Sequence, residues 1–484
     1  MAEEVELKLE LQPNDADALQ AGALLRGDPP VAQQRSIYYD TPDHDLAKAR
    51  LSLRIRRTGL TRIQTIKADG DSSAGLFARS EWEVAVPNDT PVIDDTTPLR
   101  KLLGEAHGEI MPAFELQIER QAWDIDEADA IVELVIDRGM VVAGDRSSPV
   151  CEVELELKSG DPRALFSLAR KLDAVVPVRL GVLTKAQRGY SLIGPAATVI
   201  KAERILLTRD MSAAQAFPLI VHECLRHFRL NETLLLDNGQ PEPLHQARVA
   251  LRRLRSALSL FKAMLDDQVG TKVRDDLRWL ASELGEARNL DVLLGRAEPG
   301  ALKDQLETAR ETAYARVREV LASSRTRALL LNVAEWVMTG ARRNATATRA
   351  IRDQPAQEFA SASLQHLRRQ VKKDGRALAA VDDATRHMLR KDAKKLRYAA
   401  EFFAGLFDRK RERTRHKRFV YALEGLQEQL GALNDLATGP DVLAKLGIRD
   451  APDTPPVALG SKEDLITQAA ENYQALIAAK RFWR

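Results

Sequence analysis

Glu4-Val5-Glu6-Leu7-Lys8 opens the chain with charged and apolar residues in strict alternation. Successive side chains of an extended strand point to opposite faces, so the stretch predicts a β-strand with Glu4, Glu6 and Lys8 on one face. Five further segments before residue 190 repeat this arrangement with charges of both signs. We therefore expect the charged faces to surround a common lumen, and such a lumen suits a metal ion clamped against a polyphosphate.

The repeated segments predict short strands of one antiparallel structure. Turn residues such as those at 68–71 and 87–89 separate alternating runs, which is typical of an antiparallel barrel or sandwich. A solvated outer face explains one charged strand but not six. The charged positions that share the predicted lumen face further along the chain are Arg54, Arg56, Lys67, Glu81, Glu83, Arg120, Glu133, Asp137, Glu152, Glu154, Glu156 and Lys185.

The two kinds of charge suggest two tasks. Paired carboxylates supply the hard oxygen ligands that Mg²⁺ or Mn²⁺ prefers. Arginine matches phosphate oxygens with its planar fork, and lysine matches them as a point charge. The pattern therefore indicates a site for a divalent cation and a phosphate chain.

Charge divides the 484-residue chain into unlike halves. Residues 1–200 carry 23 Lys+Arg against 33 Asp+Glu, a net of −10, whereas residues 201–484 carry 49 against 37, a net of +12. A polyanion is therefore the more natural partner of the second half. Two cysteines imply no disulfide framework, the acidic start Met-Ala-Glu-Glu is unlike a secretory signal, and no apolar run approaches about 20 residues. We expect a cytoplasmic protein that does not enter a membrane.

Beyond residue 210 the pattern becomes helical and contains an internal repeat. The run that begins at His245 matches the run that begins at His387 in spacing, an offset of 142 residues, and Leu284-Gly285 is echoed by Leu430-Gly431. We expect two related helical bundles, at about 211–345 and 355–484. The stretch 192–212, which lacks strong periodicity, is the expected boundary.

Each copy of the repeat carries a basic stripe on one helix face. At 100° per residue the members of a stripe lie close together, opposite an apolar face. Four aligned cations repel one another unless a polyanion neutralises them. We interpret the histidines as hydrogen-bond donors to phosphate rather than as catalytic groups. The stripes are His245, Arg248, Arg252 and Arg255 in the first copy and His387, Arg390, Lys394 and Arg397 in the second.

These patterns resemble two known families. The first half resembles the CYTH family of triphosphate tunnel metalloenzymes, and the repeated His-x-x-Arg-x-x-x-(Arg/Lys)-(Arg/Lys)-Leu-Arg resembles the CHAD domain. The tandem is similar to bacterial inorganic triphosphatases. The CYTH resemblance rests on Glu4-x-Glu6-x-Lys8, Tyr39-Asp40-Thr41, Leu53-Arg54-Ile55-Arg56, Lys67, Glu81-x-Glu83, Arg120 and Glu152-x-Glu154.

The resemblance implies an α+β protein with two domains. Residues 1–200 would form an eight-stranded antiparallel β-barrel tunnel that hydrolyses inorganic triphosphate with Mg²⁺ or Mn²⁺, and residues 211–484 a helical domain that binds inorganic polyphosphate. Water would attack a terminal phosphoryl group in line, with its charge neutralised by metal and cations. The implied metal ligands are Glu4, Glu6, Glu152 and Glu154. The implied phosphate ligands are Lys8, Arg54, Arg56, Lys67, Arg120 and Lys185. Asp137 and Glu81 or Glu83 would bind a second metal or position the water.

Three alternatives stay open at this point. Glu156 is a third carboxylate on the late strand and leaves the metal-binding pair ambiguous. An adenylate cyclase or a thiamine-triphosphatase would use the same tunnel. The chain could also be a protein that binds polyphosphate through its helical half, with a tunnel that no longer hydrolyses phosphate bonds. Nucleic acid is disfavoured as a partner because few aromatic residues are interleaved with the basic stripes.

Overall fold

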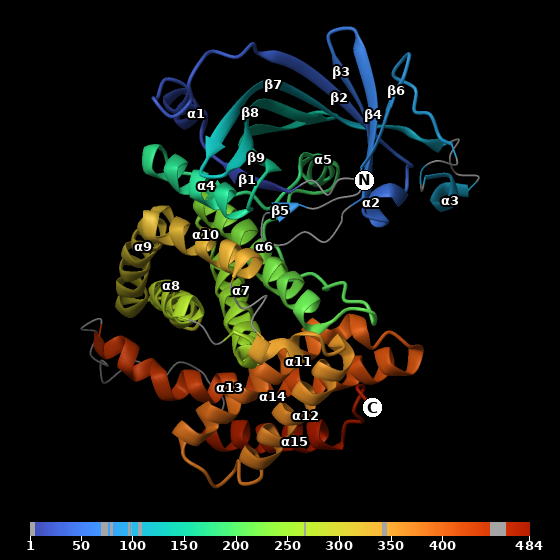
Figure 1. Cartoon of the computed structure of the whole chain (residues 1–484). Helices are drawn as coiled ribbons and strands as arrows, with labels where there is room; N and C mark the ends of the chain where they lie inside the picture. The colour runs from blue at the N-terminus through green and yellow to red at the C-terminus, as the bar shows by residue number, and fades with distance from the viewer. Residues whose placement is uncertain are drawn as a thin grey trace. The chain divides into compact units, whose positions relative to one another are not determined.

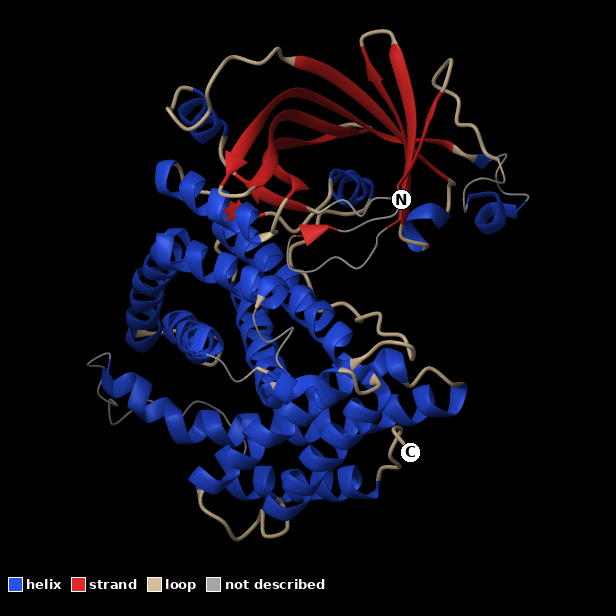
Figure 2. Cartoon of the chain, in the orientation of Figure 1, coloured by secondary structure: helices blue, strands red, loops and turns tan. Residues whose placement is uncertain are grey.

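The chain folds into two compact units. The computed structural model describes residues 5–68, 76–77, 81–94, 97, 99–104, 109–265, 268–340, 346–445 and 461–484. One unit comprises residues 1–198 with 327–339, and the other comprises 199–326 with 340–484. Every described strand lies in the first unit, and the second is helical (Figures 1 and 2). The predicted α+β organisation is confirmed, while the domain limits 1–200 and 211–484 stay a prediction.

The first unit is built on one antiparallel sheet. Its strands are β1 (Glu6–Glu10), β2 (Ala32–Asp40), β3 (Leu51–Thr58), β4 (Thr61–Ala68), β5 (Leu76–Phe77), β6 (Glu81–Ala85), β7 (Met111–Glu127), β8 (Ala130–Ala143), β9 (Arg146–Ser159) and β10 (Arg179–Leu180). The order is β10-β1-β9-β8-β7-β2-β3-β4-β6, and β5 also pairs with β1. Eight strands have five or more residues, which matches the expected number. Within the described residues no ladder joins β6 back to β1, so the sheet is curved but unclosed.

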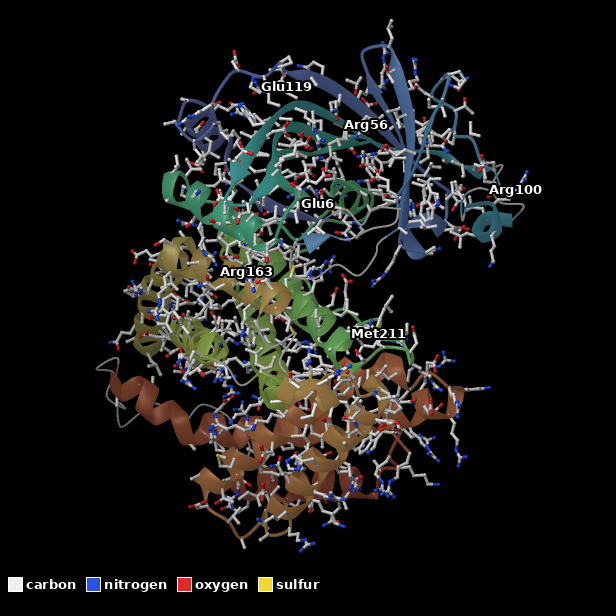
Figure 3. All side chains as sticks on the ribbon, viewed as in Figure 1. Glu6, Arg56, Arg100, Glu119, Arg163 and Met211 are labelled. Carbon is white, nitrogen blue, oxygen red and sulfur yellow. The ribbon has the colours of Figure 1, made fainter. Side chains whose placement is uncertain are left out.

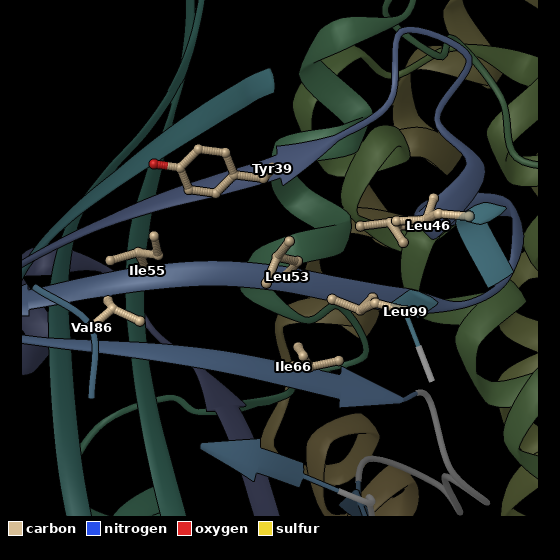
Figure 4. Packing of buried hydrophobic residues seen from close by; sticks show 8 residues of the cluster. Tyr39, Leu46, Leu53, Ile55, Ile66, Val86 and Leu99 are labelled. Carbon is tan, nitrogen blue, oxygen red and sulfur yellow. The ribbon is translucent and has the colours of Figure 1, made fainter. Parts of the chain in front are cut away.

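On β3 and β4 the sheet turns its apolar face outward. Leu53, Ile55 and Ile66 alternate with the charged positions of β3 and β4, and they pack against helix α2 (Asp45–Lys48) and helix α3 (Leu99–Leu103) (Figure 4). Burying each such side chain contributes about 1.5–3 kcal/mol. A slip of one residue would exchange the two faces, so this apolar packing fixes the register that points the charges inward.

A short helix fills the inner side of the sheet at one end. Helix α5 (Lys185–Ile193) packs against β7, β8 and β9, and Ala186 and Tyr190 join an inner apolar cluster with Tyr38 and Phe114 (Figure 1). A Cβ atom on Gly189 would lie 2.0 Å from the Phe114 ring, so only glycine allows this approach. The remaining helices of the unit are α1 (Pro13–Gln20), α4 (Arg163–Val175) and most of α10 (Ser324–Thr339), whose residues 327–339 belong to this unit.

The Tyr39-Asp40-Thr41 triplet has a structural role. The fully buried Asp40 carboxylate accepts backbone N–H bonds from Thr41 at 2.8 Å, Leu46 at 2.9 Å and Ala47 at 3.1 Å. It also accepts the Tyr190 hydroxyl at 2.7 Å. Asp40 therefore joins the end of β2 to helices α2 and α5, and it holds α5 in place inside the sheet.

The helical unit shows the duplication that the repeat predicts. Helices α6, α7, α8 and α9 pack in chain order, and α12, α13, α14 and α15 do the same. Phe217 and Phe261 recur 142 residues later as Phe359 and Phe403, and Phe261 stacks on Phe359 with ring centroids 4.6 Å apart. The helices of this unit are α6 (Ala213–Asn238), α7 (Pro241–Leu260), α8 (Gln268–Leu294), α9 (Ala301–Ala322), α11 (Arg349–Arg352), α12 (Ala356–Asp374), α13 (Asp383–Phe402), α14 (Lys410–Lys445) and α15 (Lys462–Ala478).

The segment before α6 belongs to the helical unit. The Ile200 carbonyl accepts Asn231 Nδ2 at 2.9 Å and lies 3.1 Å from His227 Nε2. Ile205 and Leu207 are buried. The helical unit therefore includes this segment from Val199 onward. The segment has neither helical nor alternating periodicity, and it lies in the stretch 192–212 that the sequence indicates as the boundary.

Candidate functional site

A charged cavity of about 230 Å³ lies on the inner side of the sheet. Its lining contains as many carboxylates as cations, and Glu6 and Arg56 are labelled among its side chains in Figure 3. The carboxylates are Glu6, Glu81, Glu83, Glu133, Glu154 and Glu156. The cations are Lys8, Arg54, Arg56, Lys67, Arg120 and Lys185. The lumen expected from strand alternation therefore exists, with eleven of these side chains placed by the sheet and Lys185 placed by helix α5.

The two signs of charge are segregated within the cavity. Neighbouring strands β1, β9 and β8 supply four carboxylates (Glu6, Glu154, Glu156 and Glu133), whereas β3, β4 and β7 supply four cations (Arg54, Arg56, Lys67 and Arg120). Two lysines stand on the acidic wall, and two glutamates of β6 stand on the basic one. The cavity can therefore present cations to one side of a ligand and oxygen ligands to the other.

Glu154 is the centre of the acidic wall. Its carboxylate accepts Arg120 Nη2 at 2.9 Å and Lys185 Nζ at 2.8 Å, and it also accepts Lys8 Nζ. Lys8 Nζ lies 3.3 Å from Glu6 as well. Burial alone would raise the pKa of Glu154, but Lys185, Lys8 and Arg120 outweigh burial and hold that pKa well below its usual range. The neighbouring cations therefore keep the Glu154 side chain in its ionised form.

Lys185 occupies a nest of three carboxylates at the inner end of the cavity. Its Nζ lies 2.7 Å from Asp137 Oδ2, 2.5 Å from Glu152 Oε1 and 2.8 Å from Glu154 Oε1. Oxygens of these three carboxylates come within 4.8 Å of one another, so they are also spaced to hold a metal ion. Burial lowers the pKa of Lys185, but the three carboxylates together raise it well above its usual range.

Asp137 and Glu152 lie behind the cavity rather than in its lining. Asp137 is 0% exposed and Glu152 is 1% exposed. Asp137 accepts Arg120 through both oxygens, from Nε at 2.8 Å and from Nη2 at 2.5 Å. This two-bond fork fixes the guanidinium toward the lumen. Of the predicted carboxylates, these two are therefore less accessible to a substrate than the alternation suggests.

Two glutamates of β6 pair with the side chains of the basic wall. Lys67 Nζ lies 3.1 Å from Glu81, and Glu83 accepts the Thr65 hydroxyl at 3.0 Å and lies 3.5 Å from Arg56. Burial and the neighbouring Arg54 lower the pKa of Arg56. A guanidinium whose charge is disfavoured in this way gains most from an anion placed beside it.

In the helical unit the two basic stripes meet. Arg252 of α7 donates to the Tyr398 hydroxyl of α13 at 3.5 Å. Burial, Arg390 and Arg252 lower the pKa of Lys394 to about 6. Burial with Arg288 and Arg252 lowers the pKa of His245 to about 4. Cations of both helices therefore oppose one another's charge, and an anion would relieve that repulsion.

Comparison with known proteins matches the two halves of the chain to two domain families. Residues 2–190 match the CYTH domain family, and residues 219–444 match the CHAD domain family. The chain carries a CYTH domain followed by a CHAD domain. It is 32% identical over 162 residues to an inorganic triphosphatase of Haemophilus influenzae, an alignment that spans 32% of this chain and 44% of the relative, less than half of that protein's length.

Two further relatives extend the comparison. An uncharacterised protein of Mycobacterium tuberculosis is 25% identical over 418 residues, which cover 77% of this chain and 76% of that protein. The crystal structure of a CHAD domain from the plant Ricinus communis is 30% identical, with a TM-score of 0.46 over 58% of this chain and 93% of that chain. In the described residues of this chain no helix is long and apolar enough to cross a membrane.

The CHAD repeat also explains its paired glycines. A Cβ atom on Gly285 of α8 would come within 3.1 Å of Arg248 Nη1, which donates to the Ala281 carbonyl at 2.8 Å. Gly431 of α14 faces Arg390 in the second copy. In each copy, a glycine on the following helix thus lets an arginine of the basic stripe pass across that helix. The repeated Leu-Gly pair in the sequence was the signal of this packing.

The two copies of the CHAD repeat are not electrostatically equal. Arg397 lies 3.5 Å from Glu401 and 3.6 Å from Glu424, so the stripe contains a cation that carboxylates already compensate. The Arg288 position of the first copy is Asn434 in the second, where it hydrogen-bonds the ring of His387. Fewer cations are therefore left for a ligand in the second copy than its sequence indicates.

Most of the predicted CYTH residues line the cavity, whereas Asp137 and Glu152 lie behind it. Glu4 lies outside the described residues. Lys185, expected at the end of the strand series, is the first residue of helix α5. Glu156, whose role the sequence left ambiguous, lines the cavity with Glu133. Sequence reasoning missed most of the neutral polar lining, whose signal was the same alternation in β2 and β3: Gln34, Ser36, Tyr38 and Ser52.

Proposed function

We propose that the CYTH domain hydrolyses inorganic triphosphate to diphosphate and phosphate with Mg²⁺ or Mn²⁺. The observation that carries the proposal is the cavity in which an acidic wall faces a basic wall. The name of the Haemophilus relative, inorganic triphosphatase, agrees with it. A phosphate chain on the basic wall would present its far side to carboxylates, and that arrangement requires a cation between them.

The charge balance of the lining supports a metal requirement. Six carboxylates and six cations leave the lining formally neutral, so a triphosphate would bring several negative charges into a site with no excess of positive charge. The donor set fits Mg²⁺ or Mn²⁺, because carboxylate oxygens such as those of Glu6, Glu154 and Glu156 are the ligands these ions take. The metal would polarise a phosphoryl oxygen and offset its charge.

The chain's own residues would orient the substrate. Arg54, Arg56 and Lys67 would hold phosphate oxygens, with Arg120 aimed at the lumen by Asp137. We propose Asp137 as a positioning residue, because both of its oxygens bind the Arg120 guanidinium. Glu81 or Glu83 would position the attacking water, since both line the cavity beside the cations.

The lining favours an inorganic triphosphate over a nucleotide or thiamine triphosphate. Among the described lining residues Tyr38 is the one aromatic side chain, and it already stacks on Phe114 with ring centroids 4.5 Å apart. Ligand pockets for larger organic molecules have volumes of about 300–1,000 Å³ and mostly apolar linings. A cavity of about 230 Å³ lined by charges offers little to a base or a thiazole.

The first prediction concerns the substrate and the metal. Phosphate release should be fastest from inorganic triphosphate, slower from ATP and thiamine triphosphate, and absent in EDTA. The measurement is phosphate release by the full chain with each substrate at fixed ionic strength, with Mg²⁺, Mn²⁺ or EDTA. Full activity in EDTA would contradict the metal requirement, and silence on every substrate would favour a protein that only binds polyphosphate.

We propose further that the CHAD domain binds inorganic polyphosphate where its two stripes meet. The support is the cluster of Arg252, Arg390 and Lys394, which raise one another's electrostatic energy across two helices. The carboxylate that acts on Arg390 and Lys394 is Asp435, and it lies 3.1 Å from Arg296. A flexible polyanion could contact both stripes at once.

The second prediction is that this binding weakens as pH rises. Burial and neighbouring arginines lower the pKa of Lys394 to about 6, so its amine is mostly neutral above that pH in the free protein. A bound polyanion raises the pKa, hence binding takes up a proton, and affinity falls by up to about tenfold per pH unit above pH 6. The measurement is the dissociation constant across this range at constant ionic strength.

A matched variant isolates the lysine. Lys394→Gln should flatten the pH dependence, because it removes the amine that takes up the proton. Charging of the terminal phosphates near pH 6 has the opposite sign, but it is common to both proteins and cancels in the comparison. Equal slopes in the variant and the unmodified chain would contradict the assignment.

A further inference from the structure

We infer that the ammonium group of Lys185 competes with the divalent metal for one binding site, formed by Asp137, Glu152 and Glu154. The metal would bind there only after the lysine side chain has moved into the cavity. This inference rests on the proposed metal-dependent function and assigns Lys185 a second role beside phosphate binding.

The first argument is steric. Lys185 Nζ is 2.5–2.8 Å from one oxygen of each carboxylate, and these are the carboxylates whose oxygens lie within 4.8 Å of one another. Mg²⁺ binds oxygen at about 2.0–2.1 Å, so its position among the same oxygens would overlap the ammonium group. One cation excludes the other, and repulsion between a single and a double positive charge strengthens the exclusion.

The second argument is that the lysine has another place to go. Lys185 itself lines the cavity, where a substrate's phosphate oxygens would replace the carboxylates as its partners. Its backbone is anchored, because Thr184 and Gln187 form a reciprocal capping box at the start of α5. The four-carbon stem can therefore swing while the helix stays in place.

The third argument is the contrast with Arg120. Arg120 is bound to Asp137 through two parallel bonds and also donates to Glu154 at 2.9 Å, so its guanidinium is held in one orientation. Lys185 makes single contacts to three acceptors and has no such fixed fork. Triphosphate would draw the lysine side chain away and leave the three carboxylates available to the metal. Metal and substrate would therefore promote one another's binding.

The test measures metal binding without turnover. In the full-length chain, Lys185→Met should bind Mn²⁺ about tenfold more tightly than the unmodified protein in isothermal titration calorimetry without substrate. Without metal the variant should also melt at a lower temperature, because three buried carboxylates lose their cation. Mn²⁺ should raise its melting temperature more than it raises that of the unmodified chain.

Two further variants make the comparison decisive. Lys171→Met removes a lysine that binds Glu127 at 2.6 Å outside the cavity lining, and it should leave the Mn²⁺ affinity unchanged. Lys185→Gln removes the charge but keeps a polar group, and it serves if the methionine variant does not fold. Tighter Mn²⁺ binding in either Lys185 variant supports the inference.

The failures are distinguishable. Equal or weaker Mn²⁺ binding by the Lys185 variants would overturn the inference, and the proposed function would stand if the unmodified chain hydrolyses triphosphate. An inactive unmodified chain would overturn the function, while the affinities would still decide the role of the lysine. Absence of Mn²⁺ binding in all proteins would overturn both.

Discussion

Glu154→Gln should lower the rate of triphosphate hydrolysis by about 100- to 1,000-fold, the loss expected when a preorganised charge is removed from a polar active site. The carboxylate is 9% exposed and accepts Lys8, Lys185 and Arg120. Glutamine has nearly the same shape but cannot accept three cations or hold a metal. The expected loss is therefore chemical rather than a consequence of altered packing.

The same substitution should affect kcat and not raise KM. Removing a negative charge leaves the lining more positive, so the triphosphate itself is bound at least as well. Breaking a buried ion network costs about 3–5 kcal/mol when one partner is lost, so the melting temperature must be measured beside the kinetics. A KM increase with unchanged kcat would place Glu154 outside the chemical step.

Glu119→Gln is the matched control. Glu119, labelled in Figure 3, is an exposed residue of β7 and accepts Gln33 Nε2 at 2.9 Å. It directly precedes Arg120 in the strand and therefore lies on the opposite face. The change is chemically identical and lies in the same sheet, so activity should be preserved. Equal loss in both variants, or activity within a few-fold of the unmodified chain for Glu154→Gln, would refute the assignment.

Arg252→Glu should weaken binding of long-chain polyphosphate by about 100-fold, because placing like charges together at an interface costs several kcal/mol. Arg252 is the cation of α7 that acts on both Arg390 and Lys394 of α13. Reversing its charge would separate the basic stripe of α7 from that of α13 and leave two weaker binding surfaces. The measurement is a binding titration at several salt concentrations, and the slope of log affinity against log salt should fall.

Lys272→Glu makes the same change of charge at an exposed position of α8. It lies nine residues before Ala281, the point at which Arg248 crosses that helix, and nine residues span about 13 Å of helix. Its effect on polyphosphate affinity should be small. A loss as large as that of Arg252→Glu would mean that net charge, and not the meeting of the two stripes, governs binding.

The alternation in the sequence was sufficient to predict the faces of the strands. Leu53 and Ile55 could only be buried outward if Arg54 and Arg56 pointed inward, because the side-chain period of a strand is two residues. The 142-residue repeat likewise predicted two similar bundles, and Phe217, Phe261, Phe359 and Phe403 confirm it. Strand alternation and an internal repeat can both be recognised in a single sequence without knowledge of the fold. The cytoplasmic location stays a prediction.

Tertiary structure alone decided which charges meet. Strand order brings β1, β9 and β8 together as the acidic wall, and helix α5 carries Lys185 into the nest formed by Asp137, Glu152 and Glu154. Period two assigns these carboxylates to the inner face, but it cannot tell Glu156, which lines the cavity, from Glu152, which lies behind it. That distinction depends on where α5 fills the sheet, and the same holds for Arg252, which reaches Lys394 only because α7 packs on α13. Contacts between distant segments follow from the packing of apolar faces, and no spacing along the chain records them.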